Sequence, residues 1–148
     1  VICLIDESLP PLESGLEAVM MKRVCVFMNV FNVHVNRSPI EGKVKKIAYT
    51  KGSFINASLD KASEKNERNA LVIQTKENIE IVVVQIAGLI ARRILSFIND
   101  GHRLKAGERF GLIRFGSRVD VYLPINTKID CGLNQKVVAG ESILASLS

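Results

Sequence analysis

The chain has 148 residues, 47% of them hydrophobic and 24% charged, which is enough apolar material for one domain with a buried core and argues against disorder. Its formal net charge of +5 suits an acidic partner, such as nucleic acid, an anionic membrane surface or a phosphorylated ligand. The three cysteines show no CxxC or His-Cys clustering, which argues against a disulfide framework and a zinc site, and no apolar run reaches the roughly 18 residues of a membrane span.

The first half of the chain predicts strands separated by polar segments. It begins inside an apolar run without an initiator methionine, so we expect a preceding segment to be missing. The second run is interrupted by Asn29, Asn32 and His34, and each of these needs a hydrogen-bond partner if it is buried. The charged segment Asn56–Asn69 predicts a short helix or an ordered loop. The predicted strands are Val1–Ile5, followed by a polar loop over Asp6–Gly15, then Arg23–Val35 and Val44–Tyr49.

The second half of the chain is rich in β-branched residues and predicts further strands. The run Ile81–Ile86 is almost continuously apolar, which indicates burial on both faces. Gly88–Leu95 has a composition that permits a helix, but its β-branched neighbours and the short turns favour a strand. The predicted strands are Ala70–Gln74, Ile79–Ile86, Gly88–Leu95, Phe110–Phe115 and Val119–Leu123.

These elements predict a mainly β fold with minor α structure, in a single domain over residues 1–148. Two similar polar turns, Gly101–Glu108 and Asn134–Glu141, are of the kind that a compact sandwich or barrel uses at its corners. We therefore expect a compact β-sandwich or barrel-sandwich hybrid that resembles biotinyl and lipoyl carrier domains.

The dipeptide Gly116-Ser117 separates two of the predicted strands and has two interpretations. A glycine within a strand pattern marks a bulge, a bend or a close backbone approach, so the simpler interpretation is a tight turn that carries an ordinary serine. The second interpretation is that the peptide bond between these residues is itself a chemical site. The local pattern alone favours the first.

Other residues with chemical potential also have ordinary explanations. His34 lies in an apolar run and is a core residue or a polar-pocket residue, whereas His102 lies in a charged turn and is expected to be exposed. Asp60-Lys61-Ala62 imitates the lysine motif of lipoyl carriers, but no strand pattern follows it. A group of basic residues is either a solvated face or a phosphate-binding surface: Arg92, Arg93, Arg103, Lys105, Arg109, Arg114 and Arg118.

Four blocks of the chain are distinctive: Val26–Gly42, Asn56–Asn69, Val83–Ile94 and Gly107–Pro124. The first block includes Asn32-Val33-His34-Val35-Asn36-Arg37-Ser38-Pro39, and the last includes Arg114-Phe115-Gly116-Ser117-Arg118-Val119-Asp120. In this order they resemble the pyruvoyl-dependent phosphatidylserine decarboxylases, in particular their short bacterial and archaeal type, and the similarity extends over nearly the whole chain.

The resemblance implies that the chain cleaves itself between Gly116 and Ser117, giving a β chain of residues 1–116 and an α chain of residues 117–148. Ser117 would be converted into a pyruvoyl cofactor, which forms a Schiff base with the substrate amine and accepts electrons when CO2 leaves. His34 is the candidate proton donor or base. Candidate substrate-binding residues are Asn32, Arg37, Arg114 and Arg118; no metal is expected.

The resemblance also implies a substrate and a location. The chain would convert phosphatidylserine or a related serine phospholipid into an ethanolamine phospholipid, as a peripheral protein on the cytoplasmic side of an anionic membrane. We expect the two cleavage chains to stay associated, a homo-oligomer to form, and no nucleic acid to bind.

The chain departs from longer family members in two places. Their Asp-Tyr-His and a second histidine three positions further on correspond to Asn32-Val33-His34 and Arg37, so a second histidine's role does not transfer. Their Pro-Ala-Asp-Gly segment would precede the first residue of this chain. The alternative functions are a lipoyl- or biotinyl-like carrier using Lys61 and a non-catalytic, lipid-binding β module.

Overall fold

The computed structural model describes residues 2–28, 35–53, 57, 62–88, 94–113, 117–137 and 144–147, and nearly all of its regular structure is β. This confirms the predicted mainly β fold with minor helix. In chain order the elements are β1 (Ile2–Ser8), the 3-10 helix η1 (Leu12–Ser14), β2 (Met21–Met28), β3 (Val35–Arg37), β4 (Gly42–Thr50), α1 (Ala62–Lys65), β5 (Arg68–Gln74), β6 (Glu80–Ile86), β7 (Ile94–Ser96), β8 (Arg103–Leu104), β9 (Arg109–Ile113), β10 (Ser117–Leu123), β11 (Lys128–Ile129) and β12 (Ala145–Ser146).

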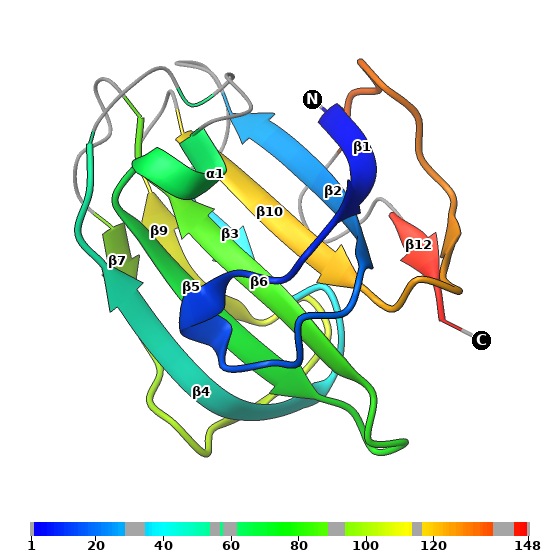
Figure 1. Cartoon of the computed structure of the whole chain (residues 1–148). Coiled ribbons are helices and arrows are strands. Elements are labelled where there is room, and N and C mark those ends of the chain that lie inside the picture. Colours follow the sequence, from blue (N-terminus) through cyan, green and yellow to red (C-terminus); the bar gives the residue numbers. More distant parts are fainter. Residues whose placement is uncertain are drawn as a thin grey trace.

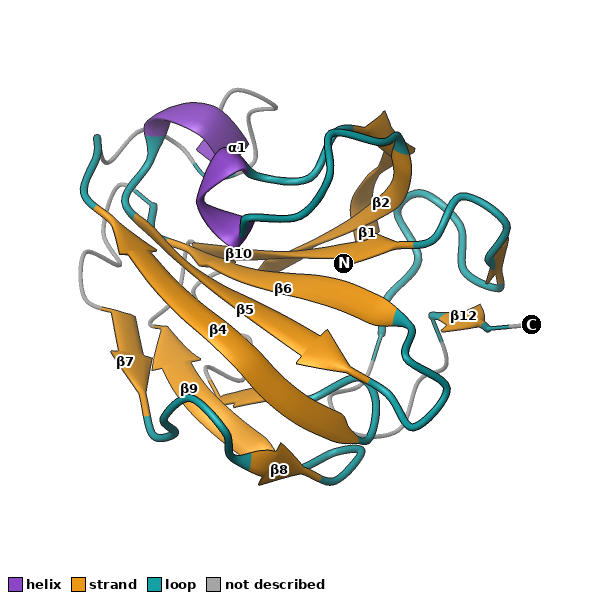
Figure 2. Cartoon of the chain, turned by 60° about the horizontal axis from the view of Figure 1, so that its bottom comes forward, coloured by secondary structure: helices purple, strands orange, loops and turns teal. Residues whose placement is uncertain are grey.

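The strands form a large antiparallel sheet and two smaller ones (Figure 1). The large sheet has the order β1-β2-β10-β6-β5-β4-β8, the second has the order β3-β9-β7, and β11 pairs with β12. Figure 2 shows α1 on one side of the large sheet and β7 and β9 on the other. The described strands pack as layers and do not close into a barrel, in agreement with the predicted sandwich. The likeness to carrier domains stays a prediction.

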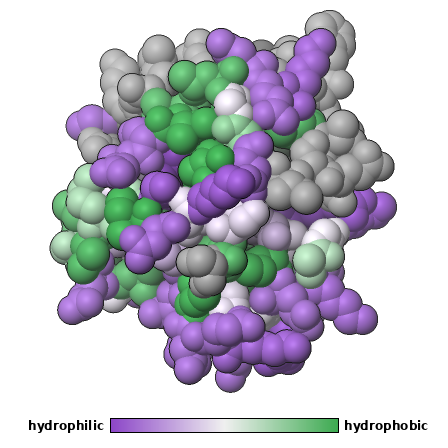
Figure 3. All heavy atoms as spheres, turned by 90° about the vertical axis from the view of Figure 1, so that its right-hand side faces the viewer, coloured by the Kyte–Doolittle hydropathy of each residue, from purple (hydrophilic) through white to green (hydrophobic). Residues whose placement is uncertain are grey.

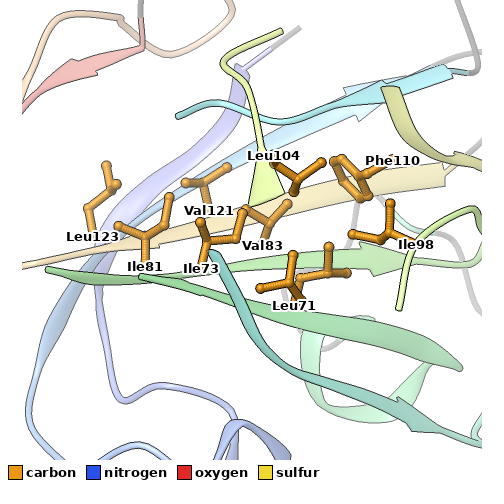
Figure 4. Close-up of a cluster of buried hydrophobic side chains, with 10 residues drawn as sticks. Leu71, Ile73, Ile81, Val83, Ile98, Leu104, Phe110, Val121 and Leu123 are labelled. Atoms are coloured by element: carbon orange, nitrogen blue, oxygen red, sulfur yellow. The ribbon is translucent and has the colours of Figure 1, made fainter. Parts of the chain in front are cut away.

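The main hydrophobic core lies between the large sheet and the second sheet (Figure 4). Alternate residues of the central strands, such as Val83 of β6 and Val121 of β10, meet Phe110 of β9 there. A second cluster covers the opposite face, where Val82 and Tyr122 pack with Ala62 of α1. β6 is therefore buried on both faces, as its apolar run predicts.

Some of the predicted boundaries were wrong. Asp6–Ser8 continue β1 and do not begin a loop, because they pair with β2 and the Asp6 carboxylate accepts hydrogen bonds from Arg23. At the end of the predicted helix or loop, Arg68 and Asn69 already belong to β5. The predicted strand Gly88–Leu95 is described only at its two ends, and Ile94–Ser96 form β7. The middle of the predicted strand Arg23–Val35 lies outside the described residues, between β2 and β3.

The surface mixes polar groups with isolated apolar ones. On the face that Figure 3 shows, hydrophobic residues lie in separate patches between hydrophilic ones. The most exposed large apolar side chains include Leu12 and Leu133, at 95% and 60%. Within the part of the chain that the structure describes, no helix has both the length and the apolar character needed to cross a bilayer.

Candidate functional site

The chain crosses from one sheet to the other immediately before Ser117. Ile113 ends β9 opposite Ile94 in the second sheet, whereas Ser117 begins β10 opposite Met28 in the large sheet. The four steps between Ile113 and Ser117 span at most about 14 Å, so the two sheets must approach each other at this end. The predicted break between two strands is thus a change of sheet.

Ser117 is a buried strand residue, so the interpretation that places it in a tight turn was wrong. Its side chain has no solvent exposure, because pairing with β2 starts at this residue and the second sheet covers the face. Its Oγ atom has no hydrogen-bond partner among the described residues. A buried hydroxyl without a partner is destabilising by about 1–3 kcal/mol and requires an explanation, of which a chemical role is one.

The side chain of Ser117 shares its face of the sheet with a chain of buried amides. Gln85 of β6 lies opposite Val119, two residues along β10 from Ser117, and its Nε2 donates to Asn36 Oδ1 at 2.8 Å. Gln85 Oε1 accepts a hydrogen bond from Asn69 Nδ2 at 3.0 Å. Asn36 of β3 also contacts the sulfur of Met28 through Nδ2, at 3.9 Å. Three amides from three strands thus connect the two sheets beside Ser117.

Sequence reasoning missed these amides as site residues. Their signal is Gln85, a lone polar residue in the otherwise apolar run Ile81–Ile86. Gly111 of β9 makes room for it, because a Cβ atom at Gly111 would lie 2.3 Å from Gln85 Nε2. A glycine that faces a buried polar residue on another strand indicates a close approach of the two strands. The sequence alone does not show which residues face each other, so this signal can be used only when the strand neighbours are known.

The opposite face of β10 carries a buried ion pair. Arg118 and Asp120 have no solvent exposure, and the guanidinium donates to the carboxylate from Nε at 2.8 Å and from Nη2 at 3.1 Å. Arg118 Nη1 also donates to the carbonyl of Ala57 at 3.2 Å. Burial alone would lower the pKa of Arg118, but the charge and hydrogen bonds of the neighbouring Asp120 carboxylate, with contributions from other nearby groups, raise the pKa overall. Arg118 is therefore a charged residue that holds β10 in place.

The neutral groups around this ion pair are also held in one protonation state. Burial, followed by the charge of Asp120, raises the pKa of the Cys25 thiol, which therefore stays protonated. The same two causes raise the pKa of Tyr122 to about 12. No group of three His, Cys, Asp or Glu residues that could hold a metal occurs in the described ranges.

The other predicted site residues are only partly placed. Asn32, His34, Arg114 and Gly116 lie outside the described residues, as does Lys61 of the alternative carrier function. The segment that contains Asn32 and His34 starts after Met28, which faces Ser117, and ends before Val35, which faces Leu112 of β9. Both of its ends are thus held beside the crossing between the sheets.

Two residues lie away from Ser117. Arg37 lies opposite Arg109 at the far end of β9, and its Nη1 donates to the carbonyl of Gly107 at 2.9 Å. The expected exposure of His102 is confirmed, with its ring bound to Glu108 at 2.8 Å.

The alternative carrier function depends on Lys61. This residue is followed directly by α1, not by the strand that a carrier hairpin needs.

The chain is similar to known proteins over most of its length. Residues 7–145 match the family described as "Phosphatidylserine decarboxylase". The chain is 61% identical over 138 residues to the "Phosphatidylserine decarboxylase proenzyme" of Azorhizobium caulinodans, which covers 93% of this chain and 59% of that protein. It is 56% identical over 144 residues to the protein of the same name from Nitrobacter winogradskyi, covering 97% of this chain and 58% of that protein.

A third relative, of the same name from Ruegeria pomeroyi, is 54% identical over 147 residues, which cover 99% of this chain and 67% of that protein. The chain therefore spans roughly three fifths to two thirds of the length of these relatives. No solved structure matches the chain.

Proposed function

We propose that this chain, which belongs to the phosphatidylserine decarboxylase family, is the self-processing, pyruvoyl-forming part of an enzyme that releases CO2 from phosphatidylserine. The observation that carries the proposal is the hydroxyl of Ser117, which is buried, has no partner among the described residues and lies where the chain changes sheets. The residues around it fit a group made from Ser117, because an unpartnered hydroxyl can be consumed without breaking a hydrogen bond.

Self-cleavage starts with addition of Ser117 Oγ to the carbonyl carbon of Gly116. The carbonyl oxygen gains negative charge, and the double bond re-forms as the nitrogen of Ser117 leaves and takes a proton, which leaves an ester. Removal of the Cα proton of Ser117 then expels the Gly116 carboxylate and gives a dehydroalanine at position 117. This tautomerises to an imine, and one water molecule replaces the nitrogen, which leaves as ammonia.

The position of β10 accounts for the association of the two chains that result. Residues 118–122 pair with β2 on one side and β6 on the other, so the new chain of residues 117–148 starts as a central strand of the large sheet. Arg118 and Asp120 fix this strand from the other face. The new chain end therefore stays in its place after the peptide bond is broken.

The pyruvoyl group, once formed, supplies an electron sink for loss of the substrate carboxylate. His34 is assigned the proton transfers, as base in self-cleavage and as donor to the carbon that loses CO2. Support comes from the chain path, because the segment that carries His34 is held at Met28 and at Val35. Asn32 and Arg114 are retained as substrate-binding candidates, whereas Arg37 and Arg118 are assigned structural contacts.

The remaining partners follow from the same proposal. A serine phospholipid is reached at a membrane, and the net charge of +5 supports peripheral attachment to an anionic surface, on the cytoplasmic side. A homo-oligomer is also expected.

The test is release of CO2 from vesicles that contain phosphatidylserine labelled in its carboxylate. The full-length protein should release labelled CO2, and Ser117→Ala should release none while giving the same circular dichroism spectrum. Activity that survives in Ser117→Ala would contradict the proposal. Loss of function on replacing Lys61, with Ser117→Ala unaffected, would favour the carrier alternative.

A further inference from the structure

The hydrogen bonds that link the side-chain amides of Asn69, Gln85 and Asn36 can run in only one direction, from donor to acceptor. The carbonyl of Leu95 can only accept, so the Gln85 amide must point its nitrogen toward it, at 3.2 Å. The same nitrogen then donates to Asn36 Oδ1, and Asn69 donates to the oxygen on the other side of the Gln85 amide. The amide nitrogen of Asn36 is therefore forced to point away from Gln85, toward Met28.

This arrangement leaves the nitrogen of Asn36 with unused donor capacity. A primary amide nitrogen carries two N–H groups, and the thioether sulfur of Met28, at 3.9 Å, is a weak acceptor. No other acceptor for this nitrogen occurs among the described residues. Asn36 is only 4% exposed, so water does not readily supply one. In the described part of the chain, the Asn36 amide nitrogen is thus a second buried polar group without a strong partner, and it is a donor.

The spare donor lies over the start of β10. Met28 is on β2 and Gln85 is on β6, the two strands that flank β10, and these strands stand about 10 Å apart. The side chain of Asn36 contacts the tips of both residues, so it bridges them above β10. Met28 lies directly opposite Ser117, and Gln85 lies opposite Val119. Asn36 therefore lies above the part of the strand that includes Ser117.

We propose that Asn36 is a catalytic hydrogen-bond donor of the self-cleavage site: its amide nitrogen holds the Gly116 carbonyl oxygen as that oxygen gains negative charge. Gln85 is the positioning residue that fixes the direction of the Asn36 amide. The inference rests on the proposed self-cleavage, and it adds two residues that were not among the candidate site residues of the sequence. A donor that is already oriented and lacks a strong partner stabilises such an oxygen without first giving up another bond.

The side-chain amide of Asn36 has a weaker hydrogen-bond acceptor than that of Asn66, an asparagine with a structural role. Asn66 donates to the carbonyl of Ala87 at 2.6 Å, so its amide nitrogen has a strong acceptor within the fold. The nitrogen of Asn36 has a sulfur atom in that position. If stability alone were selected here, an apolar side chain would pack against Met28 without leaving a buried donor poorly satisfied.

The test follows self-cleavage directly, in a pulse-chase experiment with the full-length protein made by cell-free translation. Asn36→Asp keeps the shape and the bond from Gln85 but removes both N–H donors, and Asn36→Leu removes the whole amide. Both should slow the disappearance of the precursor by about 100-fold or more, the usual effect of deleting one such donor. Cleavage of both variants at the wild-type rate would overturn the proposal.

The role of Gln85 is tested by a double-mutant cycle. Gln85→Met should slow cleavage about 10-fold, by freeing the Asn36 amide to turn, and should add nothing in the Asn36→Leu background. Equal slowing by Gln85→Met in both backgrounds would show that Gln85 does not act through Asn36.

Two controls separate the possible failures. Val44→Ala creates a cavity in the main core away from the amides, and it should lower the melting temperature without the 100-fold effect. The proposal is overturned if Val44→Ala slows cleavage as much as Asn36→Leu at an equal loss of stability. If the wild-type protein itself is never cut between residues 116 and 117, the proposed function fails, and not merely the role of Asn36.

Discussion

Ser117 and Thr127 are two buried hydroxyls that both lack a hydrogen-bond partner in the described part of the chain, and they lie at opposite ends of the β10 region. Thr127 ends a turn that follows β10: its N–H donates to the carbonyl of Pro124, and its own carbonyl accepts from Lys22 Nζ at 2.7 Å. Both hydrogen-bonding groups of the Thr127 backbone are therefore used.

The surroundings of Ser117 differ in each respect. The residue follows a crossing between two sheets, and a glycine precedes it. Within the described ranges, the amide nitrogen of Asn36 above β10 has only a thioether as acceptor. An unpartnered hydroxyl is therefore not a site by itself. In the proposed function, Ser117 is distinguished by a second poorly satisfied group nearby, the Asn36 amide nitrogen, and by the change of sheet beside it.

The sharpest test of this comparison removes each hydroxyl in turn. Ser117→Ala should abolish cleavage completely, while Thr127→Val should leave it complete, as seen by denaturing gel electrophoresis. Neither variant should lose stability from a broken hydrogen bond, because neither hydroxyl has a partner among the described residues. An uncleaved Thr127→Val protein would show that the two hydroxyls are not different in kind.

The next largest effect concerns the face of β10 that points away from Ser117. Asp120→Leu leaves the buried charge of Arg118 without its carboxylate and should lower the free energy of unfolding by about 3–5 kcal/mol. The double variant Arg118→Met/Asp120→Leu should lose less than this single variant, because no buried charge remains. Urea denaturation in the Ser117→Ala background measures both without interference from cleavage.

The same double variant tests whether the ion pair takes part in the chemistry. With Ser117 present, Arg118→Met/Asp120→Leu should still cleave, since the pair lies on the opposite face of the strand. Failure of this folded variant to cleave would move Arg118 back among the residues of the reaction.

Substitutions at two separate glycines, Gly111 and Gly132, test the packing between β6 and β9 near Ser117. Gly111→Ala would place a Cβ atom 2.5 Å from the carbonyl oxygen of Leu95 and closer still to Gln85, so we expect a loss of about 1–3 kcal/mol. Gly132→Ala meets no atom within 4 Å and should change stability by about 0.5 kcal/mol or less. Equal stabilities in chemical denaturation would contradict the close approach of β6 and β9.

The smallest effect concerns the ion pair between Glu13 and Arg68, the first residue of β5. Burial raises the pKa of Glu13, but the hydrogen bond and charge of Arg68, together with hydrogen bonds from the backbone and from Thr50, outweigh it, so the pKa lies below its ordinary value of 4.5. A depressed folded-state pKa means that the stabilisation is complete above the unfolded-state pKa and is lost as pH falls through the folded-state value.

Glu13→Gln should therefore be less stable than the parent by about 1 kcal/mol or less at pH 7, and the difference should shrink below pH 4.5. Thermal unfolding of both proteins as a function of pH measures this, again in the Ser117→Ala background. A difference that grows toward low pH would contradict the direction of the shift.

The sequence predicted the features of the fold that depend on local patterns. The alternation and the apolar runs were sufficient for most strands, and the run Ile81–Ile86 correctly indicated burial on both faces. The two strands around Gly116-Ser117 were also predicted. Asp6–Ser8 were missed because their strand depends on pairing with Met21, Lys22 and Arg23, and a polar run has no pattern that reveals such a partner.

The site was predicted only as far as its residue types allow. The sequence offered Gly116-Ser117 as a candidate, and this stays a prediction. It could not show that Asn36 and Gln85 are hydrogen-bonded, because the bond between them joins residues 49 positions apart on different sheets. Arg118 looked like a phosphate-binding residue. The period of two along a strand indicates that it faces away from Ser117, and its carboxylate partner, Asp120, lies two residues further on the same face.

The central claim is that Ser117 is consumed to make the cofactor, and denaturing mass spectrometry of the full-length protein tests it most directly. We predict two polypeptides, one that ends at Gly116 and one that begins at position 117 with a pyruvoyl group in place of serine. A single intact chain that keeps Ser117 and still releases CO2 from phosphatidylserine would contradict the account.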